Sequence, residues 1–433
     1  YFFHYTRKVY KPAQFMEDNM ADIKPFVCVR PAEDVVSAVA ALPYDVYNRS
    51  EACEKVKGRE LLFLNIDRPE TQFDDSVDTY ADVVYDEARR LLDKEISDGV
   101  FIEDKDNAYY IYELTMDGRV QTGIVACASI DDYLNNIIKK HEKTRADKEL
   151  DRINHVDRTS AQTGPIFLAY RANEKIKDII CTVKEHPPIY DFVCDDDEIR
   201  HRVFKVSEQK DIDGIREAFD SINSIYIADG HHRAASAVKV GLKRREEHPD
   251  YTGKEEFNYF LSVLFPDEEL MIMPYNRVVK DLNGLTKEEF FNAVSKYFDI
   301  EPRGKKAFYP EHKGEFGMYL GDEWYLLSAK ESILSEDPVD GLDVAVLQDF
   351  LLTPILGIGD PRVDKRIDFI GGIRGLKELE DRVHNDMAIA FSMFPTSISE
   401  LFDVADADML MPPKSTWFEP KLRSGIFIHR IEE

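Results

Sequence analysis

The middle of the chain carries a short polar segment whose side chains are suited to binding a phosphate or a metal ion. An apolar run ends there in Asp229-Gly230-His231-His232-Arg233, and an alanine-rich helical pattern follows. A carboxylate at a helix start caps backbone donors, a glycine lets a ligand approach the backbone, and an arginine offers a fork of donors to an anion. Consecutive histidines point about 100° apart on a helix, so they serve different partners. The segment therefore predicts an anion or metal site at a strand-to-helix junction.

Each of these residues also has a purely structural interpretation. Asp229 can act only as a helix cap, one histidine can be a satisfied core residue, and Arg233 can form a surface ion pair. Four such polar residues in close succession at a strand end nevertheless favour ligand binding over the structural alternative.

Residues 141–155 place cationic side chains at the spacing of one helical row. Steps of four, three, four and three separate His141, Arg145, Lys148, Arg152 and His155. An apolar row about 100° round the same helix would consist of Ala146, Leu150 and Ile153. The cationic row is a candidate anion cradle in an acidic chain. Acidic residues interleave with it, so a solvated and internally neutralised helix face is an equal alternative.

Two further features complete the candidate site. Glu142 adjoins the cationic row and is the type of group that accepts a proton from a substrate hydroxyl. Lys414, Ser415 and Thr416 follow two prolines, and proline-fixed loops hold such groups with little loss of entropy on binding. The alternative for this segment is a tail that docks through its aromatic residues and keeps its charges in water. A glycine-rich run at 371–375 matches no phosphate-loop pattern and gives only a weak signal.

Composition narrows the classes of partner. The 433 residues carry a formal net charge of −27, and such a field repels a nucleic-acid backbone, whereas a local cluster of cations can still hold a small phosphate. The cysteines form no CxxC pair, and no apolar run reaches the roughly 18 residues of a membrane span. We therefore expect a cytoplasmic protein with a small-molecule partner. Residues 1–19 are interpreted as an added or upstream extension without functional weight.

Mixed helix and strand signals predict an α+β (mixed α/β) fold. Strand-like runs at 108–116 and 120–129 flank Asp117-Gly118, which is a hairpin signal. Helices are expected at 77–97, 131–158, 232–243 and 375–394. A boundary near 267–277 divides the chain into a core at 20–266 and a C-terminal α+β region at 267–433 that packs on it.

Five segments, in this order, resemble the markers of the domain-of-unknown-function-1015 family. They are Pro43-Tyr44-Asp45-Val46, His141-Glu142-Lys143-Thr144, Gln162-Thr163-Gly164-Pro165-Ile166, Ala228-Asp229-Gly230-His231-His232-Arg233 and Pro412-Pro413-Lys414-Ser415-Thr416. The Asp-Gly-His-His-Arg segment is also similar to the signature of the ParB/sulfiredoxin-like superfamily, whose members include nucleotide-dependent kinases of free serine. This resemblance implies a ParB/sulfiredoxin-like core with additional subdomains.

The resemblance implies a nucleotide-dependent small-molecule kinase, with free L-serine as a candidate acceptor, ATP or ADP as the nucleotide, and Mg²⁺ at Asp229. The catalytic candidates are Glu142, Asp229, His231 and His232. The phosphate-binding candidates are Gly230, His232, Arg233, His141, Arg145, Arg152, Lys414, Ser415 and Thr416. A metal-assisted phosphatase or hydrolase and a non-catalytic nucleotide-sensing or partner-binding protein are the alternatives. The acceptor and the oligomeric state are not encoded in any pattern of this sequence.

Overall fold

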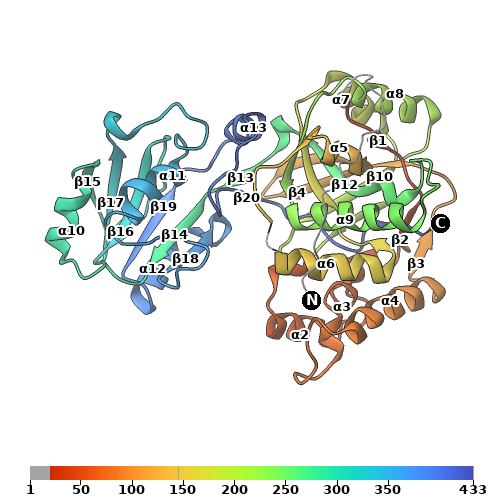
Figure 1. Cartoon of the computed structure of the whole chain (residues 1–433), viewed down its shortest axis with the longest axis horizontal. Helices are drawn as coiled ribbons and strands as arrows, with labels where there is room; N and C mark the ends of the chain where they lie inside the picture. Colours follow the sequence, from red (N-terminus) through yellow and green to blue (C-terminus); the bar gives the residue numbers. More distant parts are fainter. Residues whose placement is uncertain (1–19, 145, 433) are drawn as a thin grey trace.

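The computed structural model describes residues 20–144 and 146–432, so the expectations for residues 1–19 and for Arg145 lie outside the described residues. Within these residues the chain forms a nine-stranded, a six-stranded, a four-stranded and a two-stranded sheet, with helices packed on the two large sheets (Figure 1). This mixture of helices with largely antiparallel sheets confirms the predicted α+β class. No described helix combines the length and the apolar character that crossing a bilayer requires.

The first large sheet carries the strand-to-helix junction. Its strands, in spatial order, are β6 (Ile138–Lys139), β11 (Ile225–Asp229), β8 (Ile166–Tyr170), β12 (Tyr259–Pro266), β5 (Arg119–Ser129), β4 (Tyr109–Met116), β10 (Arg200–Val206) and β9 (Tyr190–Val193), and β1 (Ile23–Lys24) pairs with β5. β4 and β5 form the predicted hairpin, and Asp117 and Gly118 adopt φ of 51° and 79° there. β11 runs antiparallel to β8 and parallel to β6.

Helices cover this sheet in layers. α9 (His231–Glu247) buries Ala234, Ala237 and Val238 in one apolar cluster with residues of β11. α6 (Ala146–Thr159) packs against α9, and α4 (Asp82–Ser97) packs against α6 (Figure 1). The other helices of this part of the chain are α1 (Val36–Val39), α2 (Arg49–Val56), α3 (Leu64–Asp67), α5 (Ile130–Leu134), α7 (Glu174–Val183) and α8 (Gln209–Phe219).

The helix predicted over 131–158 is wrong as one continuous element. The chain instead forms α5, the short strand β6 and a loop before α6 begins at Ala146. The predicted apolar row also fails, since Leu150 is 58% exposed. Because His141 precedes α6, the five cationic residues cannot share one helical row. The spacing of the cationic residues continued across the loop by chance, but the helix did not.

The second large sheet forms a separate lobe in Figure 1. We call the part of the chain around the first large sheet the first lobe and the part around this sheet the second lobe. Its order is β15 (Phe298–Gly304), β17 (Glu323–Ala329), β16 (Glu315–Leu320), β19 (Ile389–Met393), β14 (Tyr275–Val279) and β18 (Ile367–Gly371). Its helices are α10 (Lys287–Val294), α11 (Asp343–Leu347), α12 (Gly375–Asn385) and α13 (Ile398–Asp406). The helix predicted over 375–394 is therefore too long, because β19 is a fully buried strand, and helical and strand periodicity look alike in such an apolar run.

Two small sheets connect segments that are far apart in the sequence. β13 (Ile272–Met273) pairs with β20 (Trp417–Phe418) between the two lobes (Figure 1). β21 (Ile428–Arg430) then joins a small sheet with β2 (Cys28–Pro31), β3 (Phe101–Glu103) and β7 (Ala161–Gln162). The segment after the second sheet thus returns to the first lobe. The boundaries of the two predicted regions stay a prediction.

Candidate functional site

A cleft of about 660 Å³ lies where β11 ends. The polar residues that line it include Asp45, His141, Glu142, Asp229, Lys414 and Lys421. Tyr275, Ile373 and Arg374 of the second lobe also contribute to its wall. Segments that are far apart in the sequence therefore meet at one cavity, and the strand-to-helix junction lies within it.

Asp229 is held at the junction by the local backbone. Gly230 adopts φ of 92°, a left-handed conformation that glycine tolerates, and this turn allows β11 to pass directly into α9. One carboxylate oxygen of Asp229 accepts the Gly230 N–H at 2.8 Å, and the other accepts Lys421 Nζ at 2.9 Å. Burial raises the pKa of Asp229, but Lys421 and Arg233 outweigh burial and hold the pKa well below its usual value. The carboxylate is therefore ionised throughout the physiological range.

Two ammonium groups reach the cleft from the segment that follows α13. Lys421 Nζ lies 5.0 Å from the centre of the Trp417 ring, and Lys414 Nζ lies 5.4 Å from that of Tyr275. Burial lowers the pKa of Lys421, but the charge and hydrogen bond of Asp229, together with the charge of Glu419, raise it above its usual value. The pKa of Lys414 is likewise raised in spite of burial, chiefly by Tyr275. Both groups stay protonated and supply positive charge to the cleft.

His141 and His231 form a buried aromatic pair beside the cleft. Their ring centres are 4.5 Å apart with an interplanar angle of 87°, and only 2% and 5% of the two residues is exposed. Burial lowers the pKa of His141 to about 4, against the opposing effects of Asp229 and the Ile227 backbone. Burial and the neighbouring His141 also hold the pKa of His231 well below its usual value. Neither nitrogen of His141, nor Nε2 of His231, has a hydrogen-bond partner of normal geometry among the described residues. Both rings are therefore neutral near pH 7.

Glu142 lies next to this pair, with its carboxylate 3.9 Å from Nδ1 of His231 and about half of its side chain exposed. Burial raises the pKa of Glu142, Lys414 partly offsets that effect, and the charge of Asp229 raises the pKa again. A carboxylate with an elevated pKa accepts a proton more readily than an ordinary one. Glu142 therefore has the properties of a base at the cleft, as does Glu419, whose pKa is also raised by burial.

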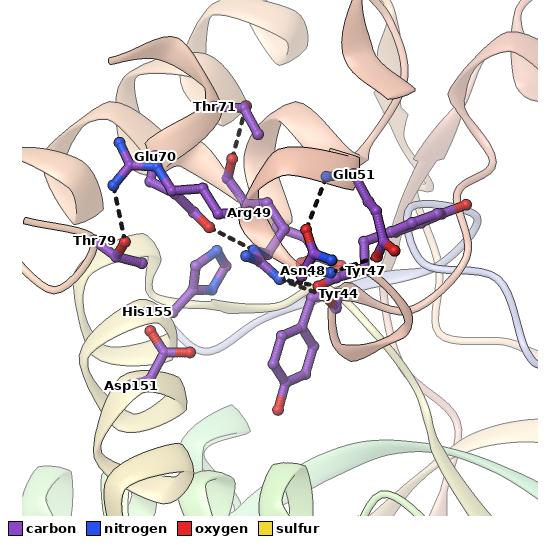
Figure 2. Close-up of polar contacts among 12 residues, drawn as sticks. Tyr44, Tyr47, Asn48, Arg49, Glu51, Glu70, Thr71, Thr79, Asp151 and His155 are labelled. Carbon is purple, nitrogen blue, oxygen red and sulfur yellow. Dashed lines mark hydrogen bonds and ion pairs between the residues drawn. The ribbon is translucent and has the colours of Figure 1, made fainter. Parts of the chain in front are cut away.

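Arg152 and His155 face away from the cleft, toward the part of the chain that contains Tyr44 and Ile66. The Arg152 guanidinium pairs with Asp151 at 2.8 Å and lies 4.0 Å from the centre of the Tyr44 ring. His155 is hydrogen-bonded through Nε2 to the Ile66 carbonyl at 2.9 Å. Figure 2 shows Asp151 and His155 on α6 beside Tyr44 and the polar contacts that fix the 44–51 segment. Arg152 therefore contacts the 44–51 segment and His155 bonds to α3, so neither side chain lies with His141 at the cleft.

Arg233 also points away from the cleft. Its Nη1 donates to the Pro165 carbonyl at 2.6 Å, and its guanidinium packs close to Gly230 and Gly164. Arg233, Arg152 and Tyr44 line a cavity of about 30 Å³, which is large enough for little more than one water molecule. Arg233 therefore supports the turn that positions Asp229 and acts on the cleft through its charge.

The match to a family model covers residues 23–345 and carries the description "Protein of unknown function (DUF1015)". The chain belongs to the DUF1015 family. A search of curated proteins finds no match for it.

Solved structures similar to this DUF1015 protein include a free serine kinase in complex with AMP (TM-score 0.33, 14% identity, 70% of this chain and 91% of that chain). A conserved hypothetical protein from Pyrococcus furiosus has a TM-score of 0.33 and 14% identity over 72% of this chain and 97% of its own. A C-terminally truncated SbnI from Staphylococcus aureus has a TM-score of 0.35 and 10% identity over 68% of this chain and 82% of its own.

The other predicted residues of this DUF1015 protein take different places. Ser415 and Thr416 both line the cleft, but Ser415 is largely buried and its hydroxyl donates to the Pro412 carbonyl at 2.6 Å. His232 is half-buried and interacts electrostatically with Glu149. Arg145 lies outside the described residues. Their predicted roles as phosphate ligands stay predictions.

Sequence reasoning missed Lys421 as a site residue of the DUF1015 protein. It lies in the same proline-rich stretch as Lys414, but no local spacing links it to Asp229. The available signal was composition, since several cations gather in this stretch of an otherwise acidic chain. Ile373 and Arg374, from the glycine-rich run with the weak signal, also line the cleft.

The donor set of the cleft fits a magnesium ion that arrives with phosphate. Among residues 20–144 and 146–432, no group of three or more histidine, cysteine or carboxylate side chains is arranged to hold a metal. Magnesium needs fewer protein ligands, because it is commonly held by one or two carboxylates together with water and phosphate oxygens. Asp229 and Glu142 line the same cleft and can supply such carboxylates.

Proposed function

We propose that the cleft binds a nucleotide, ATP or ADP, and transfers a phosphoryl group to a small hydroxyl acceptor, with free L-serine as the first acceptor to test. The observation that carries this proposal is the meeting of the Asp229–Lys421 pair, Lys414 and Glu142 in one cleft. Phosphoryl transfer requires mainly positioning and neutralisation of charge, and these residues offer both. The similarity of Asp-Gly-His-His-Arg to the signature of free serine kinases agrees with it.

The start of α9 supports phosphate binding in the same place. α9 has 17 residues and begins directly after Gly230. Helix geometry leaves the first N–H groups without partners inside the helix, and the helix dipole places partial positive charge there. Lys414 and Lys421 add full charges, which lets a phosphate approach despite the formal net charge of −27.

Glu142 is proposed to take the proton of the acceptor hydroxyl as the phosphoryl group arrives. Its raised pKa makes it a better base than an exposed carboxylate. A magnesium ion held by Asp229 would neutralise charge on the phosphates. Asp229 itself keeps Lys421 in place through their ion pair, so the cation is oriented before the ligand binds.

The test is turnover of the full chain with ATP or ADP and Mg²⁺, with L-serine and a panel of other hydroxylated amino acids, followed by ³¹P NMR of the products. The proposal expects a phosphorylated acceptor, and it expects Glu142→Gln and Asp229→Asn to reduce its formation by roughly 10²-fold or more. Glu288→Gln on α10, an exposed residue of the second lobe, is the matched control and should act like the wild type.

Two results would count against phosphoryl transfer and favour other functions. Release of inorganic phosphate that needs no acceptor would indicate a hydrolase. Tight nucleotide binding without turnover under every acceptor would indicate a nucleotide-sensing protein. A ligand-bound structure with ADP would in either case test whether phosphate lies beside Lys421.

A further inference from the structure

Arg277 is a buried arginine in the middle of the second sheet. It lies on β14, between β18 and β19, opposite Phe369 on one side and Phe391 on the other. Only 3% of the residue is exposed. No carboxylate of the described chain forms an ion pair with it. The sheet therefore contains a cation that no opposite charge of the described residues balances, although the Phe369 ring lies 5.4 Å from it.

The guanidinium holds two backbone carbonyls at the edge of the cleft. Nη1 donates to the Tyr275 carbonyl, and Nη2 donates to the Lys414 carbonyl at 3.0 Å. Tyr275 and Lys414 both line the cleft. Lys414 has a φ of 60°, which is unusual for a residue with a side chain, so this anchor fixes a strained turn. Arg277 thus lies directly behind the turn that carries one of the two ammonium groups.

The other buried arginines of the described chain differ from Arg277 in one respect. Arg152 pairs with Asp151, Arg245 with Asp131 and Arg423 with Asp197. Arg277 alone among these four has no carboxylate partner in the described chain, since its guanidinium bonds to two carbonyl oxygens and lies 5.4 Å from the centre of the Phe369 ring. Burial of a charge without an opposite charge is costly, so such a group is rare unless a ligand supplies the missing charge.

The charge of Arg277 persists at neutral pH. Burial lowers its pKa to about 10, which still leaves the guanidinium protonated near pH 7. In a region from which water is excluded, a charge acts over a longer distance than it does at a surface. The Lys414 turn and the adjoining cleft therefore lie in the field of an uncompensated cation.

We propose that Arg277 is a positioning residue for a polyanionic ligand, such as a diphosphate, and that the ligand's negative charge balances the guanidinium when the cleft is filled. The second lobe then contributes to binding although its guanidinium touches no ligand atom. Arg277 acts by holding the Lys414 turn and through the electrostatic field of its guanidinium. A ligand with more negative charge is therefore bound more tightly because of it. The inference rests on the proposed function only in requiring that the cleft binds phosphate, and it does not require transfer.

A merely structural Arg277 would behave differently. If its value lay only in the two hydrogen bonds to Tyr275 and Lys414, its removal would destabilise the free protein and affect all ligands alike. If the charge is balanced only by a ligand, replacement by an apolar side chain of similar length removes an unfavourable buried charge from the free protein. The variant is then at least as stable as the wild type when free but binds the ligand more weakly, as happens where function is maintained at a cost in stability.

The experiment compares Arg277→Met, Arg277→Lys and the control Arg362→Met, which alters an exposed arginine of the second lobe. Calorimetry measures the affinity of the full chain for inorganic orthophosphate, inorganic pyrophosphate, AMP and ADP, and thermal unfolding is recorded with and without pyrophosphate. We expect Arg277→Met to melt no lower than the wild type when free and to weaken pyrophosphate and ADP binding by roughly tenfold or more, with a smaller loss for the monophosphates. Arg277→Lys should restore much of the affinity, and Arg362→Met should resemble the wild type.

Three results would overturn the inference. They are a lower melting temperature of free Arg277→Met with unchanged pyrophosphate affinity, an equal loss in the Met and Lys variants, and absence of pyrophosphate and ADP binding by the wild type. Charge-dependent pyrophosphate binding in a protein that phosphorylates no acceptor would support this inference while the proposed transfer fails. Normal acceptor phosphorylation by Arg277→Met with unchanged nucleotide affinity would support the proposed transfer and contradict the role given to Arg277.

Discussion

Lys421 donates a hydrogen bond of 2.9 Å to the carboxylate of Asp229, and 192 positions of the sequence separate the two residues. The pair joins the end of β11 to the segment that returns after the second sheet. Neither half of the chain carries both charges, so the cleft is complete only when this late segment has folded back onto the first sheet.

Replacement of Lys421 by methionine should destabilise the protein and reduce nucleotide binding. It leaves the half-buried Asp229 carboxylate without its cation, and a partly screened pair of this kind contributes about 1–3 kcal/mol to the free energy of unfolding. Urea unfolding measures the loss. Lys377→Met, at an exposed position of α12, is the control. The double variant with Asp229→Asn should lose less than the sum of the two single variants, and strict additivity would show that the pair is not coupled.

Activity should rise with pH through the pKa of Glu142. A base must be deprotonated to act, and burial raises the pKa of this group, so the acidic limb of kcat/KM should lie above the ordinary glutamate value of about 4.3. Lys414→Met removes the cation that opposes this shift, so the limb should move to still higher pH. A pH–rate profile that Glu142→Gln leaves unchanged would exclude Glu142 as the base.

Gly230→Ala should strain the turn between β11 and α9. A φ of 92° is unfavourable for a residue with a side chain, and the added methyl group would meet Arg233 Nη2 at 3.1 Å. We expect a loss of about 1–2 kcal/mol in the free energy of unfolding. Gly359→Ala is the control, since its backbone is not left-handed and open space surrounds it. Equal stability of the two variants would contradict the role given to this turn.

The buried state of His141 should make stability depend on pH. Its folded pKa of about 4 lies below the unfolded value of about 6.5, so the unfolded chain binds more protons between these values. Stability is therefore retained above about pH 6.5 and falls as the pH drops toward 4, by up to about 3 kcal/mol from this residue. His141→Gln should flatten this dependence, and the exposed control His186→Gln should leave it as in the wild type. Urea unfolding at pH 7 and pH 5 compares them.

Local patterns predicted the junction well. The strand before Asp229, the helix after Gly230 and the Asp117-Gly118 hairpin are confirmed, because each depends on neighbouring residues and on backbone preferences that operate over a few positions. The α+β class followed from the same signals. Glu142 and Lys414 were selected from residue type and context, and both do line the cleft with Asp229.

Relationships between distant segments were not predictable in this way. The cationic spacing from His141 to His155 suggested one helix, but tertiary packing turned Arg152 toward Tyr44 and paired His141 with His231. Lys421 pairs with Asp229, and no carboxylate of the described residues pairs with Arg277, because of which strands and segments become neighbours in the fold. The spacing of residues within one segment carries no information about that. The predicted domain limits and the catalytic roles stay predictions.

The last described strand affects the order in which the protein can assemble during synthesis. β21 lies between β2 and β7, so the small sheet begun by residues 28–31 cannot close until residues 428–430 have left the ribosome. Until then the partly made first lobe exposes the edges of both strands to chaperones and to other nascent chains.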